Sequence, residues 1–445
     1  MQLQYAIASA TATHHPQHSN TRRLLLLTTT ITFIVATLLP THTLAAYNSD
    51  LSDNTADVTE STENDSYAGN SYASNGNSNS NKYSNSGSRK CDKNPLAALT
   101  FQLSGNNLRW PCESTKNIYV QSGRYVPRNV IVTRAQLQRD DAFVALPRYK
   151  QGVPFTLGRV QLKKGECVAK IAPYPCWAIQ EEGNCQALQS VVDIVVDANG
   201  LLWALDVGLV NTLEQPIRRC GPKIVAINTA DNKVVKSIDL SDLVTAESRL
   251  QFIVVDYSKD NKPFVYVADA GARSILVYDI SDSKSYRIVL PKATAPTTDV
   301  LYMALTTSSE GTSTLYFTYL SSPRLYSIRG QYLRVGQGAG SIVDVGAKPY
   351  GKQMVLLGAD GGTNLFFRYK GENDIYMWNS ETCFKAANLQ DVQHGGDCRL
   401  STQVLPGHKR FMWALESNFH DFISERTGCN GASIVLHPVV RECDD

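Results

Sequence analysis

Short apolar runs and polar turns alternate over residues 191–290, and the same order of runs occurs twice there. The first copy has its runs at 191–197, 201–206, 223–228 and 234–240, and the second at 252–256, 264–269, 274–279 and 285–290. The runs are rich in β-branched and aromatic residues, and Gly, Asn, Asp and Lys separate them. Each copy therefore predicts four short antiparallel strands, and neither shows the apolar period of a helix.

Weaker copies of this pattern continue to the end of the chain and precede it as well. Apolar-aromatic runs at 300–305, 314–319, 364–369, 374–379 and 410–415 follow the clear copies, and runs at 130–133, 141–149 and 159–162 come before them. A four-stranded unit repeated every roughly 50–60 residues is typical of propeller blades, since one such sheet cannot bury both of its faces alone. We predict an all-β, six-bladed propeller of four-stranded antiparallel blades over residues 96–445, with 191–290 near the second and third blades.

The first 95 residues have a different character. Residues 1–46 read as a secretory signal peptide, because Arg22 and Arg23 precede an apolar stretch that is too short for a membrane span and ends near small residues. Residues 47–95 are rich in Ser, Asn and Gly, and we expect a disordered linker there. Asn64 begins a glycosylation sequon in this linker. These features predict a secreted, extracellular protein with no membrane contact after signal cleavage.

Charge and cysteine content narrow the class further. The formal net charge is only +2, which gives no indication of a nucleic-acid partner. Ten cysteines lie after the signal, and secretion makes disulfides the expected state of all ten. We expect a cysteine-stapled loop between Cys167 and Cys185, while the pairing stays open. The candidates are Cys91, Cys112, Cys167, Cys176, Cys185, Cys220, Cys383, Cys398, Cys429 and Cys443.

Four motifs in order resemble those of the Yellow/major royal jelly protein family of insects. The segment 143–149 followed by Gly152-Val153-Pro154 resembles the family's "PRW…G(V/I)PATL", and 202–208 resembles "LWVLDTG". Residues 266–269 with 277–279 are similar to "YIAD…VYD", and 303–305 with 315–317 to "GMALSP…LYF". The resemblance covers most of residues 101–430 and is closer to the Yellow branch, in particular to its eggshell-associated members.

The resemblance implies a six-bladed propeller of secreted proteins, in agreement with the strand pattern. Two positions depart from it, because Ala198 and Met377 stand where the family often has cysteines, so the family's disulfide map does not transfer. Amine-binding salivary members use an Asn and a Phe two positions apart in the central pocket, and Asn364 and Phe366 match that pair. A Phe ring can hold a cationic amine and an Asn amide can orient it, although a turn residue and a blade-core residue explain the pair equally simply.

No catalytic, cofactor or metal motif accompanies these features. The glycines at 336–340 lack the spacing of a dinucleotide loop, so we expect no cofactor there. Aspartates at strand ends could surround a metal ion, but turn capping explains them better, and we predict no metal site. These aspartates are Asp193, Asp197, Asp206, Asp256, Asp269 and Asp279.

Three functions stay open at this point. The first is a non-enzymatic matrix protein of eggshell (vitelline membrane or chorion) or cuticle, with other matrix components as partners. The second, compatible with it, is a binder of small aromatic amines or catechols. The third is conversion of dopachrome by tautomerisation in the melanin pathway, as in some Yellow proteins, with His394, His408 or His420 as the candidate base.

Overall fold

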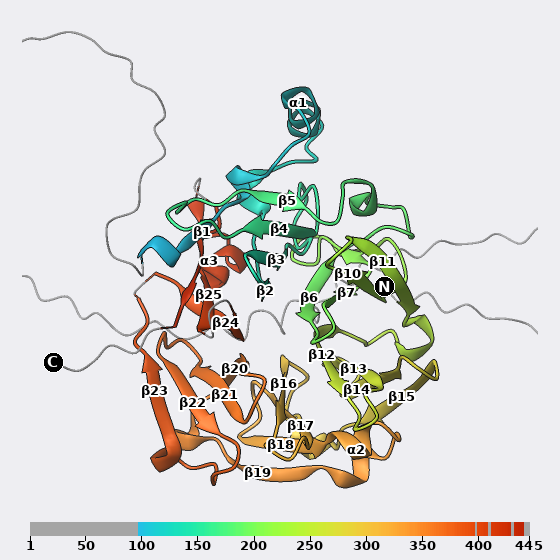
Figure 1. The fold of residues 1–445 in the computed structure, drawn as a ribbon, viewed down its shortest axis with the longest axis vertical. Coiled ribbons are helices and arrows are strands. Elements are labelled where there is room, and N and C mark those ends of the chain that lie inside the picture. Colours follow the sequence, from blue (N-terminus) through green and yellow to red (C-terminus); the bar gives the residue numbers. More distant parts are fainter. Residues whose placement is uncertain (1–96, 397, 408–410, 429–430, 440–445) are drawn as a thin grey trace, which may run out of the picture. The chain divides into compact units, whose positions relative to one another are not determined.

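A computed structural model describes residues 97–396, 398–407, 411–428 and 431–439. These residues form six four-stranded antiparallel sheets arranged as the blades of a propeller (Figure 1). The predicted fold is therefore confirmed. The expected signal peptide (1–46), the linker (47–95) with Asn64, and His408 lie outside the described residues.

Five blades follow one another along the chain, each running from its inner to its outer strand. Blade 1 contains β2 (Arg134–Gln138), β3 (Asp141–Ala145), β4 (Leu157–Gln161) and β5 (Ile171–Pro173), and blade 2 contains β6 (Val191–Val196), β7 (Leu201–Asp206), β10 (Lys223–Asn228) and β11 (Lys233–Asp239). Blade 3 contains β12 (Leu250–Tyr257), β13 (Pro263–Asp269), β14 (Ser274–Asp279) and β15 (Lys284–Val289). Blade 4 contains β16 (Leu301–Thr307), β17 (Ser313–Tyr319), β18 (Arg324–Arg329) and β19 (Val343–Ala347), and blade 5 contains β20 (Met354–Ala359), β21 (Asn364–Tyr369), β22 (Ile375–Asn379) and β23 (Leu389–Gln393).

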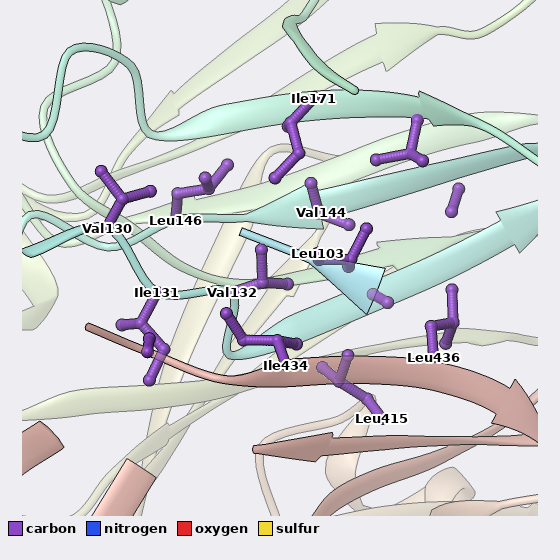
Figure 2. Close-up of a cluster of buried hydrophobic side chains, with 14 of the residues drawn as sticks. Leu103, Val130, Ile131, Val132, Val144, Leu146, Ile171, Leu415, Ile434 and Leu436 are labelled. Carbon is purple, nitrogen blue, oxygen red and sulfur yellow. The ribbon is translucent and has the colours of Figure 1, made fainter. Parts of the chain in front are cut away.

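The sixth blade joins the two ends of the described chain and closes the ring. It contains β24 (Leu400–Pro406), β25 (Met412–Ser417) and β26 (Ile434–Pro438), and its outer strand is β1 (Phe101–Leu103). Phe101 pairs with Leu436, and its ring stacks 6.2 Å from the ring of Trp413. Figure 2 shows Leu103, Ile434 and Leu436 of this closing blade beside apolar side chains of blade 1. Ring closure thus rests on apolar packing between the closing blade and blade 1.

The strand predictions for blades 2 and 3 are confirmed to within about two residues, but two other details differ. Residues 130–133 are not a strand, and Val130, Ile131 and Val132 instead pack as an extended segment into the core beneath blade 1 (Figure 2). A short hairpin of β8 (Leu209–Val210) and β9 (Ile217–Arg218) occupies the excursion within blade 2. Apolar content predicts burial in both cases, and it does not by itself predict backbone pairing.

The helices of the described residues are short and lie outside the sheets. They are α1 (Glu113–Gln121), α2 (Gly330–Leu333) and α3 (Phe419–Ile423). Among the described residues, no helix has the length and apolar character that a bilayer crossing requires. Figure 1 shows α1 projecting beyond blade 1, whereas α3 lies against the closing blade.

Most of the strand-end aspartates accept hydrogen bonds from nearby backbone amides, as the sequence predicts, whereas Asp256 binds the Tyr266 hydroxyl and Arg334. Asp197 accepts from the amides of Asn199 and Leu201, which closes the turn between β6 and β7. Gly200 has a φ of 78° in that turn, a conformation that disfavours residues with a Cβ atom. Asp279 similarly accepts from two amides of the turn that follows β14. These carboxylates therefore fix turns.

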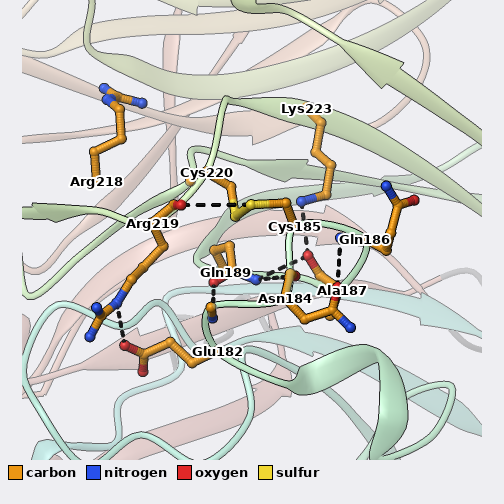
Figure 3. The surroundings of a disulfide bond; sticks show 12 residues. Glu182, Asn184, Cys185, Gln186, Ala187, Gln189, Arg218, Arg219, Cys220 and Lys223 are labelled. Carbon is orange, nitrogen blue, oxygen red and sulfur yellow. Dashed lines mark hydrogen bonds and ion pairs between the residues drawn. A yellow bond between two sulfur atoms is a disulfide. The ribbon is translucent and has the colours of Figure 1, made fainter.

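The cysteines agree only partly with the expected pairing. Cys185 and Cys220 form a disulfide that ties the loop before blade 2 to the segment before β10, and Figure 3 shows the Arg219–Glu182 ion pair beside it. The predicted cysteine-stapled loop between Cys167 and Cys185 is therefore wrong for Cys185, because Cys185 pairs with Cys220 of blade 2. Cys167 is also disulfide-bonded. Exposed free thiols are found at Cys112, Cys176, Cys383 and Cys398, contrary to the expectation that all ten pair, and Cys91, Cys429 and Cys443 lie outside the described residues.

Candidate functional site

The first strand of every blade faces the centre of the ring. These inner strands, β2, β6, β12, β16, β20 and β24, contact one another in succession until β24 meets β2 (Figure 1). A cavity of about 110 Å³ lies among them. Its lining draws on all six blades and on α3, and comprises Thr133, Arg134, Tyr149, Val192, Gln251, Phe252, Val300, Tyr302, Val355, Arg368, Thr402, Phe419 and Ile423. We refer to it as the channel cavity.

The channel cavity lies at the end of the ring where the inner strands begin. The lining residues that belong to inner strands occupy the first few positions of those strands, and several are unpaired because the strand is bulged there. The pairing register shifts around Val192 in β6, around Gln251 and Phe252 in β12, and around Thr402 in β24. A bulge leaves its extra residue out of the ladder and redirects the side chain, which is why bulges are common beside functional sites.

Hydrogen bonds between neighbouring inner strands position these bulges. The Asp193 carboxylate in β6 accepts from the amide of Ile253 in β12 at 2.8 Å. The Gln251 carbonyl oxygen accepts from the amide of Leu301 in β16 at 2.9 Å, and the Gln403 oxygen in β24 accepts from Ala135 in β2 at 2.8 Å. An inner strand has no strand beside its free edge, so these side chains supply the acceptors that a further strand would have supplied.

Close approach between inner strands also requires a glycine. Gly358 in β20 has a φ of 147°, and a Cβ atom there would come within 2.2 Å of the Val404 carbonyl oxygen in β24. Any other residue at this position would push blade 5 away from the closing blade. The close contact between blade 5 and the closing blade, beside the channel cavity, therefore depends on the absence of a side chain at residue 358.

Two arginines give the channel cavity its charge. Arg134 lies 3.4 Å from the buried Asp193 carboxylate through its Nε atom, and its guanidinium lies 4.8 Å from the centre of the Phe252 ring. Arg368 is 4% exposed and donates from Nε to the carbonyl of Ser401 and from Nη1 to that of Tyr369. Within the described residues, no ion pair is made by Arg368 and no hydrogen bond involves Nη2 of either arginine. The Nη2 groups of Arg134 and Arg368 can therefore donate hydrogen bonds to a ligand in the cavity.

Burial determines the protonation behaviour of Asp193. Loss of solvent raises the pKa of this carboxyl to about 6, and Arg134 and the amides of Ile253 and Ile194 oppose the rise. As the pH falls below neutrality, a growing fraction of Asp193 is protonated and no longer offsets the positive charge of Arg134. The channel cavity becomes more positive in mildly acidic solution.

Aromatic rings form much of the remaining wall. Phe252 and Tyr302 lie with their ring centres 5.5 Å apart, and Tyr149 and Phe419 lie 5.8 Å apart on another part of the lining. Phe419 and Ile423 come from α3, so this helix contributes to one side of the channel cavity. The wall thus offers flat apolar surfaces together with guanidinium donors.

The predicted ligand pair, Asn364 and Phe366, lies elsewhere in blade 5. Asn364 begins β21 and donates from Nδ2 to the Asp360 carboxylate at 2.7 Å, across the turn between β20 and β21. Phe366 is 3% exposed and packs in the apolar core between blades 4 and 5. Neither residue lines the channel cavity. Amine binding by this pair stays a prediction, while the contacts match those of a turn residue and a core residue.

The described histidines also lie outside the cavity lining. His394 is largely exposed and lies 3.3 Å from Asp374, and His437 lies 3.4 Å from the buried Glu416. His420 is on α3 between two lining residues, and its Nδ1 atom has no hydrogen-bond partner in the part of the chain that the structure describes. Of the predicted base candidates that the structure describes, His420 is thus the one next to the channel cavity.

One surface group has ligand atoms close enough together for a metal ion. It comprises Asp374, Asp391 and His394, whose candidate ligand atoms all lie within 4.8 Å of one another. His394 and Asp391 are exposed, and the group lies outside the lining of the channel cavity. Exposed acidic groups of this kind are common without an ion, so the group supports no role for a metal in the channel.

The residues that line the channel cavity were not predicted from the sequence, although the sequence contains a pattern that marks their position. Four inner strands carry an amide or carboxylate side chain that accepts a backbone hydrogen bond from the next blade: Gln136, Asp193, Gln251 and Gln403. A polar residue at a buried strand position needs a partner, so its recurrence from repeat to repeat marks the free edge of the inner strand. Gln251 itself and the residues Val192, Phe252 and Thr402, which lie beside three of these positions, line the cavity.

Replacing Asp193 by Asn should remove one part of the pH dependence of stability. The folded-state pKa of about 6 lies above the ordinary value of 3.8, so this group's contribution is complete below 3.8 and is lost as the pH rises through 6. The free energy of unfolding of the unmodified protein, relative to Asp193→Asn, should therefore fall by ~1–3 kcal/mol between about pH 4 and about pH 7. Urea unfolding over this range measures the difference. Asp282→Asn, at an exposed turn, is the control, and a pH-independent difference for Asp193→Asn would contradict the assignment.

Comparison with known proteins identifies the family. The family model described as "Major royal jelly protein" matches residues 189–443. Major royal jelly protein 1 of Apis mellifera is 26% identical over 307 residues, which cover 61% of this chain and 67% of the relative. A protein named dopaminechrome tautomerase, from Drosophila melanogaster, is 30% identical over 174 residues, which cover 38% of each chain. A solved luciferin-regenerating enzyme aligns over 72% of this chain and 93% of its own, with 10% identity and a TM-score of 0.43.

The family match spans more than half of the chain and includes blades 2 to 5, from β6 onward. It agrees with the motifs at 202–208, 266–269 and 303–305, which lie on the strands β7, β13 and β16. The chain belongs to the Yellow/major royal jelly protein family.

Proposed function

We propose that this chain is an extracellular matrix protein whose channel cavity binds a small, uncharged aromatic ring that carries oxygen atoms. A catechol, or the ortho-quinone formed when a catechol is oxidised, has this chemistry. The observation that supports the proposal is the combination of aromatic walls with two guanidinium groups whose Nη2 atoms make no hydrogen bond within the described residues.

The walls suit a flat ring of limited size. Phe252 and Tyr302 from neighbouring blades offer adjacent aromatic surfaces, and stacked or edge-to-face rings gain about 0.5–1.5 kcal/mol beyond simple burial. The cavity volume of about 110 Å³ is well below the ~300–1,000 Å³ of clefts that hold drug-sized ligands. A single-ring molecule therefore fits the available space better than an extended ligand.

The charge of the lining separates the two ligand classes that the sequence leaves open. Arg134 and Arg368 both line the cavity, and no carboxylate is among its described lining residues. The Asp193 carboxylate is buried behind the wall and already paired with Arg134. A protonated amine would meet uncompensated positive charge at Arg368. Catechol hydroxyls or quinone carbonyls would instead accept hydrogen bonds from the guanidinium groups, so an oxygen-bearing ring is favoured over a cationic amine.

Titration calorimetry should show binding of 4-methylcatechol, and weaker binding of dopamine, which carries a similar ring and a positive charge. Arg134→Gln should weaken 4-methylcatechol binding about tenfold or more, because it removes a charged hydrogen-bond donor. Phe252→Leu, which leaves the Arg134–Asp193 pair in place, should weaken it several-fold through loss of ring contact. Arg324→Gln, which removes an exposed ion pair on blade 4, is the matched control.

Equal affinities of the unmodified protein and the three variants for 4-methylcatechol would show that the channel cavity is not the binding site. In the same series, Asn364→Ala tests the pair predicted from sequence. If Asn364→Ala abolishes binding while Phe252→Leu does not, the ligand site lies at the pair and the channel assignment is wrong.

The matrix role is supported by family membership and by the composition of the chain before the propeller. Residues 47–95 are rich in Ser, Asn and Gly and contain recurring tyrosines, whose rings can be cross-linked by oxidation. We expect eggshell or cuticle to retain the protein after extraction in detergent with a reducing agent, and a specific antibody measures the retained fraction. Complete recovery in the first aqueous extract would contradict the matrix role.

Tautomerisation of an oxidised catechol is the second candidate, and the relative named dopaminechrome tautomerase favours it. The reaction moves a proton from ring carbon and returns one to oxygen, so it needs a base near the ring. Guanidinium groups beside a quinone oxygen would stabilise the negative charge that develops there. Of the candidate bases that the structure describes, His420 on α3 is the one next to the lining.

A rate measurement decides between binding alone and turnover. If the chain only binds, the absorbance of dopaminechrome mixed with the purified protein should decay at the rate of the buffer blank. A faster decay that is reduced at least tenfold in both Phe252→Leu and His420→Gln would establish the tautomerase function instead. His394→Gln, at an exposed histidine far from the lining, is the control.

A further inference from the structure

A second and larger cleft lies outside the ring, between α1 and the outer strands of blade 1. It has a volume of about 790 Å³. Its walls are the segment 106–116, which runs into α1, and the segment 159–175, which includes β4 and β5. Asn232, from the turn between β10 and β11 of blade 2, closes one end. We refer to it as the α1 cleft, and none of its residues lines the channel cavity.

Positive charge predominates in the α1 cleft. Two of the basic residues are paired, since Lys116 lies 3.1 Å from Glu113 and Arg159 lies 2.6 Å from Asp141. The basic residues that line the cleft are Arg109, Lys116, Arg159, Lys163 and Lys170, and the acidic ones are Glu113 and Glu166. Arg109, Lys163 and Lys170 form no ion pair in the part of the chain that the structure describes. A negatively charged ligand in the cleft would be attracted by these three unpaired cations.

Within the described residues, three buried polar atoms of the lining side chains have no hydrogen-bond partner: the Tyr174 hydroxyl, the indole N–H of Trp110 and the Nε–H of Arg159. Leaving such a group unsatisfied is unfavourable, and most buried polar groups in proteins are paired. All three can donate a hydrogen bond. Three unused donors in one positively charged cleft indicate an acceptor that carries negative charge.

Tyr174 lines the cleft together with Arg159 and Asn232. Tyr174 is 2% exposed, and its ring lies 4.7 Å from that of Phe143 in the blade core. Burial raises the pKa of the hydroxyl to about 12, and the nearby charges that act on it are those of Arg159, Asp141 and Asp231. Asp231 precedes Asn232 in the turn that closes the cleft. The hydroxyl therefore stays protonated as a donor.

The other donors are held by rigid neighbours. The Trp110 ring lies 5.1 Å from that of Trp177 and 5.0 Å from that of Tyr125, so its indole N–H has a fixed direction. The Nη2 atom of Arg159 is held by Asp141, which leaves Nε as the unused donor. Donors fixed in advance bind an acceptor without a further ordering cost.

We propose that the α1 cleft binds a small oxyanion-bearing ligand, with a carboxylate, sulfate or phosphate group held by Tyr174, Trp110 and Arg159. Arg109, Lys163 and Lys170 supply the opposing charge at the more exposed part of the cleft. The same oxyanion chemistry can come from a free small molecule or from a group on an acidic polysaccharide, and both sources enter the test below. The proposal does not depend on the function of the channel cavity.

Cys112 provides a reporter within the cleft. It precedes α1, lines the cleft and carries an exposed thiol with hydrogen bonds to Ser114 and Thr115, which lower its pKa to about 7. Because the thiolate is the reactive form, this cysteine should react readily with iodoacetamide. An anion in the cleft would both block access and disfavour the thiolate. Cys383 and Cys398 lie far from the cleft in sequence, are exposed, and serve as internal controls.

The experiment measures alkylation of each thiol in the full-length protein by peptide mass spectrometry. Inorganic sulfate, inorganic phosphate, citrate and a sulfated oligosaccharide are titrated at constant ionic strength with chloride as the balancing anion. At least one of them should slow alkylation of Cys112 in a saturable manner while the rates at Cys383 and Cys398 stay unchanged. Equal slowing at all three thiols, or slowing at none, would overturn the proposal.

Two variants test the donors and the charge. Tyr174→Phe removes a hydroxyl that has no partner among the described residues, so the variant should fold normally and bind the protecting anion about tenfold more weakly. The double variant Lys163→Gln/Lys170→Gln, at exposed positions, should weaken it as well, and Lys284→Gln on blade 3 is the control. Unchanged protection in Tyr174→Phe would overturn the proposed geometry, whichever anion protects. Tighter protection by the sulfated oligosaccharide than by sulfate, lost in the same variants, would assign the ligand to a polysaccharide.

Discussion

The free edge of each inner strand is the constraint on which the rest of this propeller depends. An inner strand pairs with the second strand of its own blade and has no strand on its other side, so its outward N–H groups lack a ladder partner. Asp193, Gln251 and Gln403 supply that partner from the neighbouring blade. An unpaired buried N–H costs about as much as a lost hydrogen bond, so these contacts fix both the spacing and the register of adjacent blades.

The same arrangement produces the channel cavity. The inner strands of blades 2, 3 and 6 are bulged where they meet their neighbours, and the residues released from the ladder point into the cavity instead. Arg134 joins both roles, because it pairs with Asp193 at the seam and presents its guanidinium over the Phe252 ring in the lining. The polar contact between blades 1 and 2 that stabilises the fold therefore also provides positive charge to a ligand in the cavity.

The fold could be predicted from the sequence to a large extent, and the site could not. Runs such as 201–206 and 264–269 are long, apolar and bounded by turn residues, so their strands follow from local pattern alone. The closing strand is only three residues long, and its partner, β26, lies more than 300 positions away, which no local pattern reveals. The lining of the cavity is harder still, because it takes one or two residues from each of six blades. Asn364 and Phe366 match a pair of family residues in place and in spacing along one strand, whereas adjacent strands decide which side chains reach the cavity.

The two cavities have different chemistry. The channel cavity offers rings and guanidinium groups within a confined space, whereas the α1 cleft is larger, more polar and lined by unpaired cations. Crystals of the protein soaked with 4-bromocatechol would locate the ring-binding site directly from the anomalous scattering of bromine. The account predicts one ordered bromine site in the channel cavity, beside Phe252 and Tyr302. An ordered site only at Asn364 and Phe366 or in the α1 cleft, or no ordered bromine at all, would contradict it.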